Sequence, residues 1–321
     1  MLSHTGAPRW WHRATVDAAG RRMGEPKAIV ITGASRGLGL ASVAQMYRQG
    51  WRVLAAMRAP ESGMAQLRAK VAGVVDDSRL IPVQLDLTDA ASVAAAAKVI
   101  EEAVGAPRVL VHNAGISAAG TVEETPIELW ERMFATHVLG PVQLTKALLP
   151  AMRTAGRGRI VMISSQAGVR GMPEIAAYSA AKGALERWAE SLAGEVAPIG
   201  LGVTVLVTGT FNTDIITDAG TSDHRDFAGP YAAHHVAIER RGRFAMRFAA
   251  EPDRFARHLA RAVEDRAPFT RHAVGQDARM LVVANRLLSG KASHRVARLV
   301  MGIPPPGALL SVPSTESDKH G

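Results

Sequence analysis

Short apolar runs alternate with longer helical patterns along most of this chain, and this order constrains the fold more than any other feature. The runs are continuously apolar, as is typical of strands buried on both faces. We expect strands at residues 28–32, 52–56, 81–86, 109–112, 159–164, 203–207 and 269–274. We expect helices between and after them, at 38–49, 90–104, 127–152, 180–196 and 252–264. This alternation predicts an α/β fold with a doubly wound parallel sheet of about seven strands and helices on both faces.

The two ends of the chain and one internal segment depart from this alternation. Residues 1–26 are polar and basic, and we expect a disordered extension there. Residues 210–247 become polar and rich in Gly, Asp, His and Arg, which is typical of a lid or a poorly ordered loop. One domain is therefore expected over 27–285, followed by a C-terminal helix and a flexible tail over 286–321.

The composition excludes several kinds of site. The 321 residues include no cysteine, which rules out disulfides, thiolate metal sites and cysteine nucleophiles. The formal net charge is +9, and residues 238–300 hold fourteen Lys and Arg against six Asp and Glu. That excess indicates either an acidic partner, such as nucleic acid, anionic lipid or a phosphate-bearing substrate, or the solvated faces of ordinary helices. Because aromatic and basic residues do not interleave, no nucleic-acid partner is expected.

Two further kinds of site are not expected. No run of about 18 residues is apolar enough for a transmembrane helix, so we expect a cytoplasmic location. His224, His234 and His235 match no metal-ligand spacing, so no metal site is predicted.

A glycine-rich turn connects the first expected strand to the first expected helix. Its sequence is Thr32-Gly33-Ala34-Ser35-Arg36-Gly37-Leu38-Gly39. Glycines permit a tight turn and let backbone N–H groups approach a pyrophosphate, whose charge the helix N-terminus favours. The turn predicts a Rossmann-type dinucleotide site whose cofactor-binding residues include Gly33, Ser35, Arg36, Gly37, Leu38 and Gly39.

The end of the second expected strand bears on the choice of dinucleotide. NAD-preferring folds place an acid there to bind the ribose 2′-hydroxyl. Here the strand is followed by Arg58, with no acid. Arg36 and Arg58 together offer two guanidinium groups to a 2′-phosphate, although both are alternatively plain surface arginines. We expect NADP(H) in preference to NAD(H).

Ser165, Tyr178 and Lys182 are the strongest candidates for chemistry. Tyr178 and Lys182 lie four residues apart and so share one helix face. A free tyrosine has a pKa near 10. A nearby ammonium favours the phenolate and suits the hydroxyl to proton transfer. Ser165 follows a buried strand, where its hydroxyl can bond a substrate oxygen. The three residues predict an acid–base site beside a nicotinamide.

With these motifs the chain resembles the short-chain dehydrogenase/reductase family over about residues 26–285, and its arginines resemble those of the NADP(H)-preferring branch. The resemblance implies that Tyr178 is the catalytic acid/base and that Ser165 holds the substrate oxygen. It implies that Lys182 binds the nicotinamide ribose and lowers the pKa of the tyrosine. It also implies cofactor contacts from Asp86, Leu87, Asn113, Ala114, Gly115, Gly209 and Thr213.

Three positions depart from the family pattern. His112 replaces an asparagine beside Asn113, and Thr208 replaces a proline. His137 stands where the family has an asparagine that is thought to hold a water of a proton relay. A histidine can donate or accept at one nitrogen and titrates near neutrality. His137 therefore either maintains the relay, as a fourth catalytic residue, or is a core histidine that leaves the relay broken.

The substrate class rests on a weaker resemblance. Residues 252–279 are similar to the C-terminal pattern of members that act on steroids, retinoids and related lipophilic alcohols. In the expected lid, the side chains that either cover an apolar ligand or pack internally are Phe211, Ile215, Ile216, Phe227 and Tyr231.

We therefore expect an oxidoreductase that moves a hydride between NADP(H) and a carbonyl or secondary alcohol on a lipophilic, steroid-, retinoid- or acyl-like substrate. One alternative is a catalytically silent NADP(H)-binding sensor or scaffold, because of His137. Another is a basic surface protein that binds a membrane or nucleic acid. The resemblance also implies a homodimer or homotetramer that pairs the helices near 127–152 and 178–196.

Overall fold

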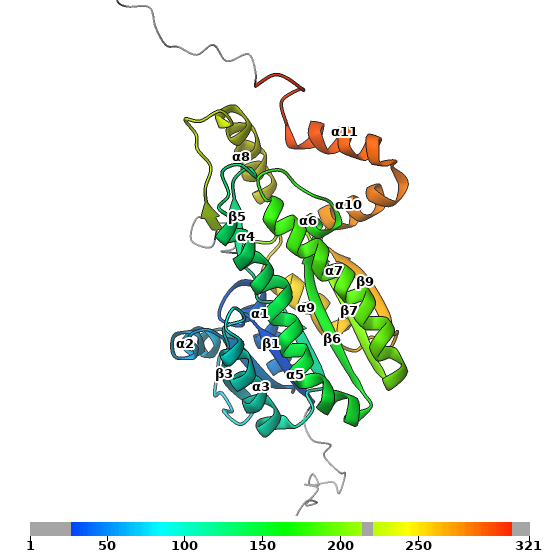
Figure 1. The fold of residues 1–321 in the computed structure, drawn as a ribbon. Coiled ribbons are helices and arrows are strands. Elements are labelled where there is room, and N and C mark those ends of the chain that lie inside the picture. The colour runs from blue at the N-terminus through cyan, green and yellow to red at the C-terminus, as the bar shows by residue number, and fades with distance from the viewer. Residues whose placement is uncertain (1–26, 214–220, 310–321) are drawn as a thin grey trace, which may run out of the picture.

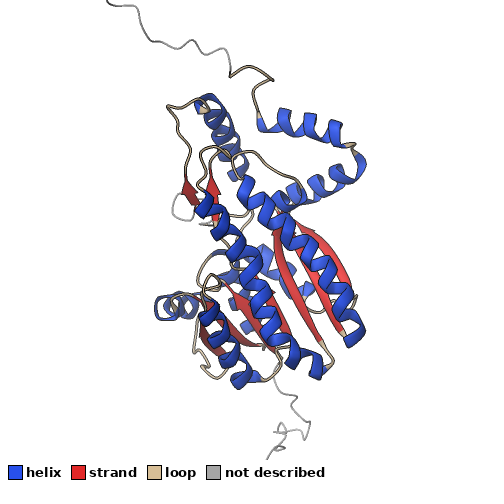
Figure 2. Ribbon diagram, in the orientation of Figure 1, coloured by secondary structure: helices blue, strands red, loops and turns tan. Residues whose placement is uncertain are grey.

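A computed structural model describes residues 27–213 and 221–309 of the chain. The expected disordered extension, Ile215 and Ile216 of the lid, and the end of the tail lie outside the described residues. Seven strands form one sheet in the order β3-β2-β1-β4-β6-β7-β9, and every neighbouring pair is parallel (Figure 2). The strands are β1 Ala28–Thr32, β2 Arg52–Met57, β3 Leu80–Gln84, β4 Val109–His112, β6 Gly158–Ser165, β7 Leu201–Thr208 and β9 Phe269–Val274. The predicted α/β fold class is confirmed.

Alternate strand residues belong to two separate cores, one on each face of the sheet. Val30 of β1 belongs to one core, whereas its neighbours Ile29 and Ile31 belong to the other. The first core is completed by the helices α3 Ala90–Val104, α5 Gly140–Ala155 and α7 Ala176–Val196. The second is completed by α1 Gly37–Arg48, α2 Pro60–Val71 and α9 Pro252–Ala262. Figure 1 shows these two layers in front of and behind the sheet. Burial on both faces explains why the strands are continuously apolar.

The helix expected over 127–152 is interrupted. The chain forms α4 Ile127–Phe134, then a π-helical turn, η1 Ala135–Leu139, and only then α5. A π turn inserts an extra residue into the helical ladder and is frequent at functional sites. A β-carbon at Gly140 would collide with the carbonyl oxygen of Leu87, so the helix after the π turn packs closely on the segment that follows β3.

The expectation of a loop over 210–247 is wrong for much of its length. Thr221–Asp223 forms a short strand, β8, that pairs with β5 Ser117–Ala119, and Ala232–Met246 forms helix α8. His235 is the buried residue of α8. A helix that buries one polar residue shows no apolar stripe in its sequence, and the stripe is the signal that predicts a surface helix.

Two helices, rather than one, occupy the C-terminal region. They are α10 Gln276–Leu287 and α11 Gly290–Met301, so the predicted boundary at residue 285 falls inside a helix. Two short elements complete the described chain, α6 Gln166–Val169 and the 3-10 turn η2 Ala197–Ile199. Within residues 27–213 and 221–309, no helix is both long enough and apolar enough to cross a bilayer.

Candidate active site

The turn between β1 and α1 has the shape of an anion cradle. Gly33 and Gly37 have positive φ angles of 68° and 52°, which favour glycine. A β-carbon at Gly39 would collide with the carbonyl oxygen of Gly33. Helix α1 begins after Arg36 without a side-chain cap, and its first turn holds no acidic residue. Its first N–H groups therefore remain available to an anion, and the turn fits the pyrophosphate of a dinucleotide.

Strand β4 ends against this turn. The side-chain amide of Asn113 donates to the carbonyl oxygens of Thr32 and Gly33, at 2.8 and 3.2 Å. The Thr32 hydroxyl accepts from the backbone N–H groups of Asn113 and Ala114, both at 3.0 Å. A β-carbon at Gly33 would lie 2.7 Å from the Cα of Ala114. The two segments predicted to hold the cofactor are therefore locked together.

Thr213 and Gly209 follow β7 and have different neighbours. The methyl group of Thr213 would lie 3.3 Å from a β-carbon at Gly37, so Thr213 borders the glycine turn. A β-carbon at Gly209 would collide with the carboxylate of Asp277, which also accepts from the N–H of Thr210 at 2.7 Å. Asp277 begins α10 and was not predicted as a site residue, because its partners lie far away in the sequence.

Arg58 and Asp86 follow β2 and β3, two strands that pair in parallel, so they emerge at the same edge of the sheet. The carboxylate of Asp86 accepts from the N–H and hydroxyl of Thr88 at 2.9 and 2.7 Å. These bonds, with a smaller effect from Arg58, lower the pKa of Asp86. Arg58 is exposed, and neither it nor Arg36 forms an ion pair among the described residues. Both guanidinium groups are free to meet an anion at this edge.

The three predicted catalytic side chains converge. Ser165 ends β6, and its hydroxyl accepts from the N–H of Ala167 at 3.2 Å and lies close enough to the Tyr178 hydroxyl of α7 to favour the charged form of that tyrosine. The amine of Lys182 lies 5.7 Å from the centre of the Tyr178 ring and donates to the carbonyl oxygen of Ile163 at 2.7 Å. Lys182 is buried and Tyr178 is partly buried. The structure therefore places a phenol, a hydroxyl and an amine around one point.

The expected lowering of the Tyr178 pKa by Lys182 is not found. Burial raises the pKa of Tyr178 to about 12, and the hydrogen bond with Ser165 offsets only part of this effect. Burial also lowers the pKa of Lys182 to about 7, against the pull of the Glu186 carboxylate. An amine that is only partly protonated at neutral pH attracts a phenolate weakly. Desolvation of both groups therefore outweighs their mutual attraction.

His137 borders the same point from the π turn. Its ring packs edge-on against Tyr178, with ring centres 5.4 Å apart. Its Nε2 lies 2.9 Å from the carbonyl oxygen and 3.3 Å from the N–H of Ile116. Burial and the charge of Lys182 hold the pKa of His137 well below its usual value, so the ring is neutral. Its Nδ1 is buried without a hydrogen-bond partner among the described residues.

Comparison with known proteins tests the resemblance. Residues 27–223 match the family model for short chain dehydrogenases. This chain belongs to the short-chain dehydrogenase family. It is 33% identical to a 3-ketodihydrosphingosine reductase of Bacteroides thetaiotaomicron over 223 residues, covering 68% of this chain and 78% of the relative. A crystal structure of a short-chain dehydrogenase from Streptomyces avermitilis is 31% identical, has a TM-score of 0.73, and covers 86% of this chain and 96% of that one.

A vertebrate relative aligns over a shorter part. The chain is 35% identical to dehydrogenase/reductase SDR family member 7B of Xenopus tropicalis over 205 residues. The match covers 62% of this chain and spans slightly less than two thirds of that relative, at 65%.

Two departures from the short-chain dehydrogenase pattern have structural roles here. His112 is buried, its Nε2 lies 2.8 Å from the hydroxyl of Thr145, and burial lowers its pKa to about 3, so it is a neutral core residue. The hydroxyl of Thr208 donates to the carbonyl oxygen of Ser164 at 2.8 Å. That bond links β7 to β6 directly beside Ser165.

Glu186 is a member of the short-chain dehydrogenase site that the sequence analysis missed. It is buried one turn after Lys182 on α7. Its carboxylate accepts from the Ser164 hydroxyl and from Arg271 of β9, both at 2.6 Å. The four-residue spacing from Lys182 was the available signal. Glu186 is therefore a buried carboxylate next to Lys182 that accepts two hydrogen bonds.

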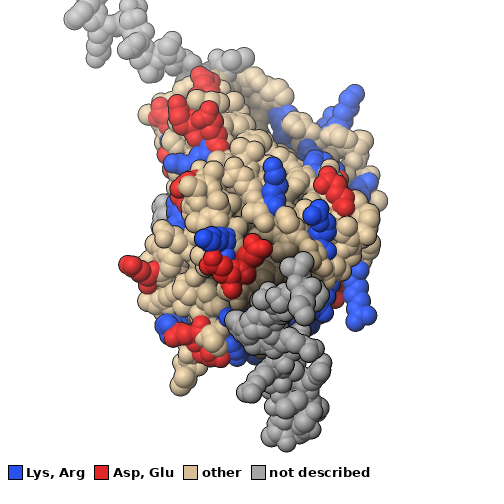
Figure 3. All heavy atoms as spheres, turned by 60° about the horizontal axis from the view of Figure 1, so that its bottom comes forward, with Lys and Arg blue, Asp and Glu red and all other residues tan. Residues whose placement is uncertain are grey.

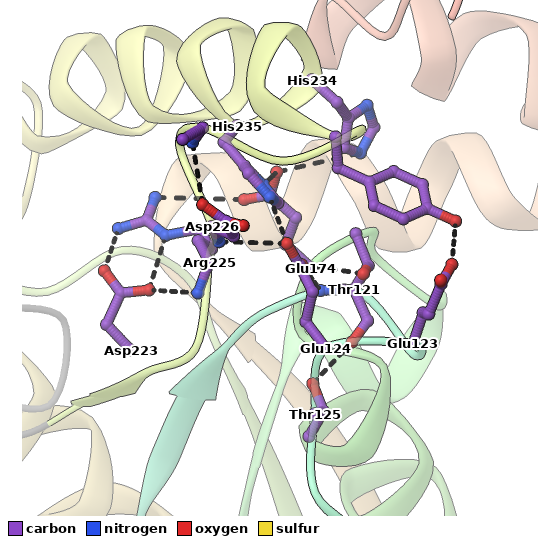
Figure 4. Close-up of polar contacts among 12 residues, drawn as sticks. Thr121, Glu123, Glu124, Thr125, Glu174, Asp223, Arg225, Asp226, His234 and His235 are labelled. Carbon is purple, nitrogen blue, oxygen red and sulfur yellow. Dashed lines mark hydrogen bonds and ion pairs between the residues drawn. The ribbon is translucent and has the colours of Figure 1, made fainter. Parts of the chain in front are cut away.

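A polar cluster joins α8 to the segments that follow β5 and precede α7 (Figure 4). His235 of α8 bonds through Nδ1 to Glu174, just before α7, and through Nε2 to Glu124, after β5, at 2.7 and 2.8 Å. Burial disfavours the charged ring, but the two carboxylates outweigh it and raise the pKa of His235. Arg225 pairs with Asp223 at 2.6 Å and lies 4.0 Å from Glu174. The predicted lid is thus tied to the catalytic helix by charge.

For Phe211 the structure decides between the two alternatives of the sequence analysis. Phe211 is buried against Phe255 of α9, with ring centres 5.8 Å apart, so it packs internally rather than covering a ligand. The Tyr231 hydroxyl donates to Glu123 at 2.8 Å. Phe227 remains partly exposed beside His235. Among the described residues, no group of three or more His, Asp or Glu side chains is placed to hold a metal ion.

Proposed function

We propose that this protein is an NADP(H)-dependent oxidoreductase that interconverts a carbonyl and a secondary alcohol on a lipophilic substrate. The observation that carries the proposal is the convergence of the Ser165 and Tyr178 hydroxyls beside the buried amine of Lys182. Family membership and the glycine cradle support a dinucleotide at this point.

The chain supplies the proton and the orientation. Bound NADP(H) supplies or accepts the hydride. In the reducing direction the Tyr178 hydroxyl gives its proton to the developing alkoxide, and Ser165 donates a hydrogen bond to the same oxygen. A neutral phenol with a pKa of about 12 is in the protonation state that this step requires. The donors are fixed before reaction, since Ser165 ends a buried strand and Tyr178 lies on a packed helix.

The preference for NADP(H) rests on charge. Arg36 precedes α1 and Arg58 directly follows β2, where NAD-preferring folds place an acid. A 2′-phosphate gains charge-assisted hydrogen bonds from guanidinium groups, whereas a 2′-hydroxyl gains much less.

A lipophilic substrate is supported by two kinds of likeness. Residues 252–279 resemble the pattern of members that act on lipophilic alcohols, and a relative at 33% identity is named for a sphingoid-base ketone. We propose a long-chain or polycyclic ketone as the substrate class.

The test of the activity compares two tyrosines. We expect Tyr178→Phe to lower turnover by at least about a hundredfold, because general acid catalysis supplies about 10²–10⁴. NADPH affinity, measured by fluorescence titration, is expected to change little. Tyr231→Phe is the matched control, since its hydroxyl is bonded to Glu123 away from the three catalytic side chains. Undiminished turnover of Tyr178→Phe on a panel of long-chain and steroid ketones would refute the assignment.

The test of the cofactor exchanges a charge. Arg58→Asp is expected to weaken NADPH binding by about tenfold or more and to shift the preference toward NADH, since a charged hydrogen bond contributes about 1.5–3 kcal/mol. Arg153→Asp, an exposed charge change at the end of α5, controls for net charge. An NADPH-to-NADH ratio that Arg58→Asp leaves unaltered counts against the 2′-phosphate role.

A silent NADP(H)-binding protein is the second candidate, and the unpartnered Nδ1 of His137 favours it. If the asparagine-held relay is broken here, the wild type binds NADPH without turnover on the whole panel, and His137→Asn restores turnover. If the wild type turns over and His137→Asn leaves or lowers the rate, His137 serves the relay.

We also propose a homodimer or homotetramer built on α4, α5 and α7. Ile127 at the start of α4 and Leu139 at the end of the π turn are apolar and 65% and 56% exposed, which supports an interface on this helical stretch. Sedimentation velocity measures the oligomeric state directly.

A further inference from the structure

Exposed apolar side chains concentrate on the two C-terminal helices. On α10, Met280, Val283 and Leu287 are 73%, 54% and 79% exposed, and their spacing places them in one stripe. The opposite side of α10 is also apolar, where Ala278 is fully buried and Val282 packs on the core. A surface helix needs only its inner face to be apolar, so the outer stripe requires its own explanation.

Helix α11, which follows α10 after two residues, carries a second exposed apolar set. Its exposed apolar residues are Val296, Leu299 and Val300, at 45%, 72% and 65%. We call these six side chains of α10 and α11 the α10–α11 surface. An exposed apolar group of this extent is typical of an interaction site rather than of a free surface.

The charges around this surface have one sign. Residues 276–302 hold five basic side chains, Arg279, Arg286, Lys291, Arg295 and Arg298, and one acid. That acid, Asp277, already accepts from the backbone of Thr210. On the face shown in Figure 3, by contrast, basic and acidic side chains are interspersed.

Three of these basic groups lack an acidic partner. Arg286, Lys291 and Arg295 are exposed, and none forms an ion pair within the part of the chain that the structure describes. Their charges therefore remain available to an anionic partner.

The two helices are anchored to the catalytic end of the molecule. Helix α10 packs against β9 and against α6, which begins directly after Ser165. Arg170, which follows α6, donates a hydrogen bond to the buried Ser293 of α11. Helix α11 also contacts α8, and Figure 1 shows α8, α10 and α11 at one end of the molecule. The α10–α11 surface is thus a fixed part of the fold.

We propose that the α10–α11 surface docks on an anionic lipid bilayer, with its apolar side chains at the headgroup–acyl boundary and its arginines and lysine at the lipid phosphates. Apolar and basic residues side by side on helices are what an anionic interface binds. A second copy of the chain fits less well, because a two-fold interface would bring one basic surface against the same surface. This inference does not depend on the proposed activity.

Vesicle sedimentation of the full chain tests the proposal. Wild-type protein is expected to sediment with vesicles that contain phosphatidylglycerol, less with pure phosphatidylcholine, and less as the salt concentration rises. The triple variant Met280→Ser/Leu287→Ser/Leu299→Ser is expected to lower the vesicle partition constant by about tenfold or more, because less apolar area enters the interface. Val74→Ser/Val99→Ser, exposed apolar residues elsewhere, is the matched control.

The charge arm is separate. Arg286→Glu/Lys291→Glu/Arg295→Glu is expected to abolish the preference for anionic vesicles, whatever the catalytic rate. Because the substituted residues are exposed, each variant is expected to fold, and thermal unfolding checks this. The proposal is overturned if wild-type protein binds neither vesicle type. It is also overturned if the serine variant binds vesicles as wild type does but sediments as a smaller oligomer, since the surface would then join subunits.

Discussion

Gly115 and His137 show how one missing side chain shapes the site. A β-carbon at Gly115 would lie 2.7 Å from Cε1 of His137, whose ring is held between Ile116 and Tyr178. The ring is buried and cannot move away without disturbing Tyr178. His137, which replaces the asparagine of the family, is therefore packed together with Gly115 as one unit.

We expect Gly115→Ala to lower the free energy of unfolding by about 1–3 kcal/mol, because it overpacks a filled space. Urea denaturation measures this change. Gly194→Ala on α7 is the matched control: nothing lies within 4 Å of its β-carbon, and removing a helical glycine should add about 0.5–1 kcal/mol. In Gly115→Ala/His137→Asn the smaller side chain should relieve most of the loss. Equal effects of the two alanine variants would show that His137 does not confine Gly115.

Among the elements, the π turn and helix α8 decide the shape of the site. The π turn carries His137 in the middle of what is otherwise a regular helical sequence. Helix α8 is held through His235, whose two carboxylate partners belong to different segments. Both elements depend on contacts across the fold, and neither has a periodic sequence of its own.

The attachment of α8 is expected to depend on pH. The pKa of His235 is raised in the folded state, so the attraction to Glu124 and Glu174 is fully present below the ordinary histidine pKa and is lost as the pH rises through the raised value. We therefore expect amide protection in α8, corrected for intrinsic exchange, to be higher near pH 6 than near pH 8. His234 and the Arg225–Asp223 pair also face this cluster: burial lowers the pKa of His234, and Arg225 and Asp223 keep their charges between pH 6 and pH 8.

His235→Ala tests the same attachment at one pH. It leaves the buried carboxylate of Glu174 and the partly buried carboxylate of Glu124 without this cation, and breaking a buried pair costs about 3–5 kcal/mol. Hydrogen exchange should show the loss in α8 more than in the central strands. His294→Ala, an exposed histidine on α11, is the control. Protection in α8 that is insensitive both to pH and to this change would mean that other contacts hold the helix.

For the whole molecule, cofactor binding and stability are linked. A ligand at a hundred times its dissociation constant adds about 2.7 kcal/mol to the folded state. We expect NADPH at that level to raise the melting temperature by several degrees, measured by differential scanning fluorimetry. NADH at the same concentration should raise it less, and Arg58→Asp should remove the difference. No shift with either dinucleotide would contradict a nucleotide site in the cradle.

Much of this architecture was predictable because short stretches of sequence determine it. Strands buried on both faces must be apolar at every position, and the observed β1 and β4 have the predicted bounds. The glycine turn and the Tyr178–Lys182 spacing are likewise short-range patterns. The positions of the strands along the sequence could therefore be predicted approximately without tertiary information.

Other features were beyond local reasoning. Helix α2 buries only Gly63, Leu67 and Val71, too thin a stripe to stand out, and α8 buries a histidine. Glu186 and Asp277 join the site through partners distant in the chain, apart from the one-turn relation of Glu186 to Lys182.

The amino-acid sequence by itself predicted the strands of the central sheet, several of the helices, the dinucleotide turn and the identity of the phenol, hydroxyl and amine. Only the folded arrangement decided the charge states of those groups, the π turn under His137 and the docking of α8. The physical reason is desolvation: a pKa and a polar contact depend on how much water the rest of the fold removes, and that quantity is a property of all the packed elements together.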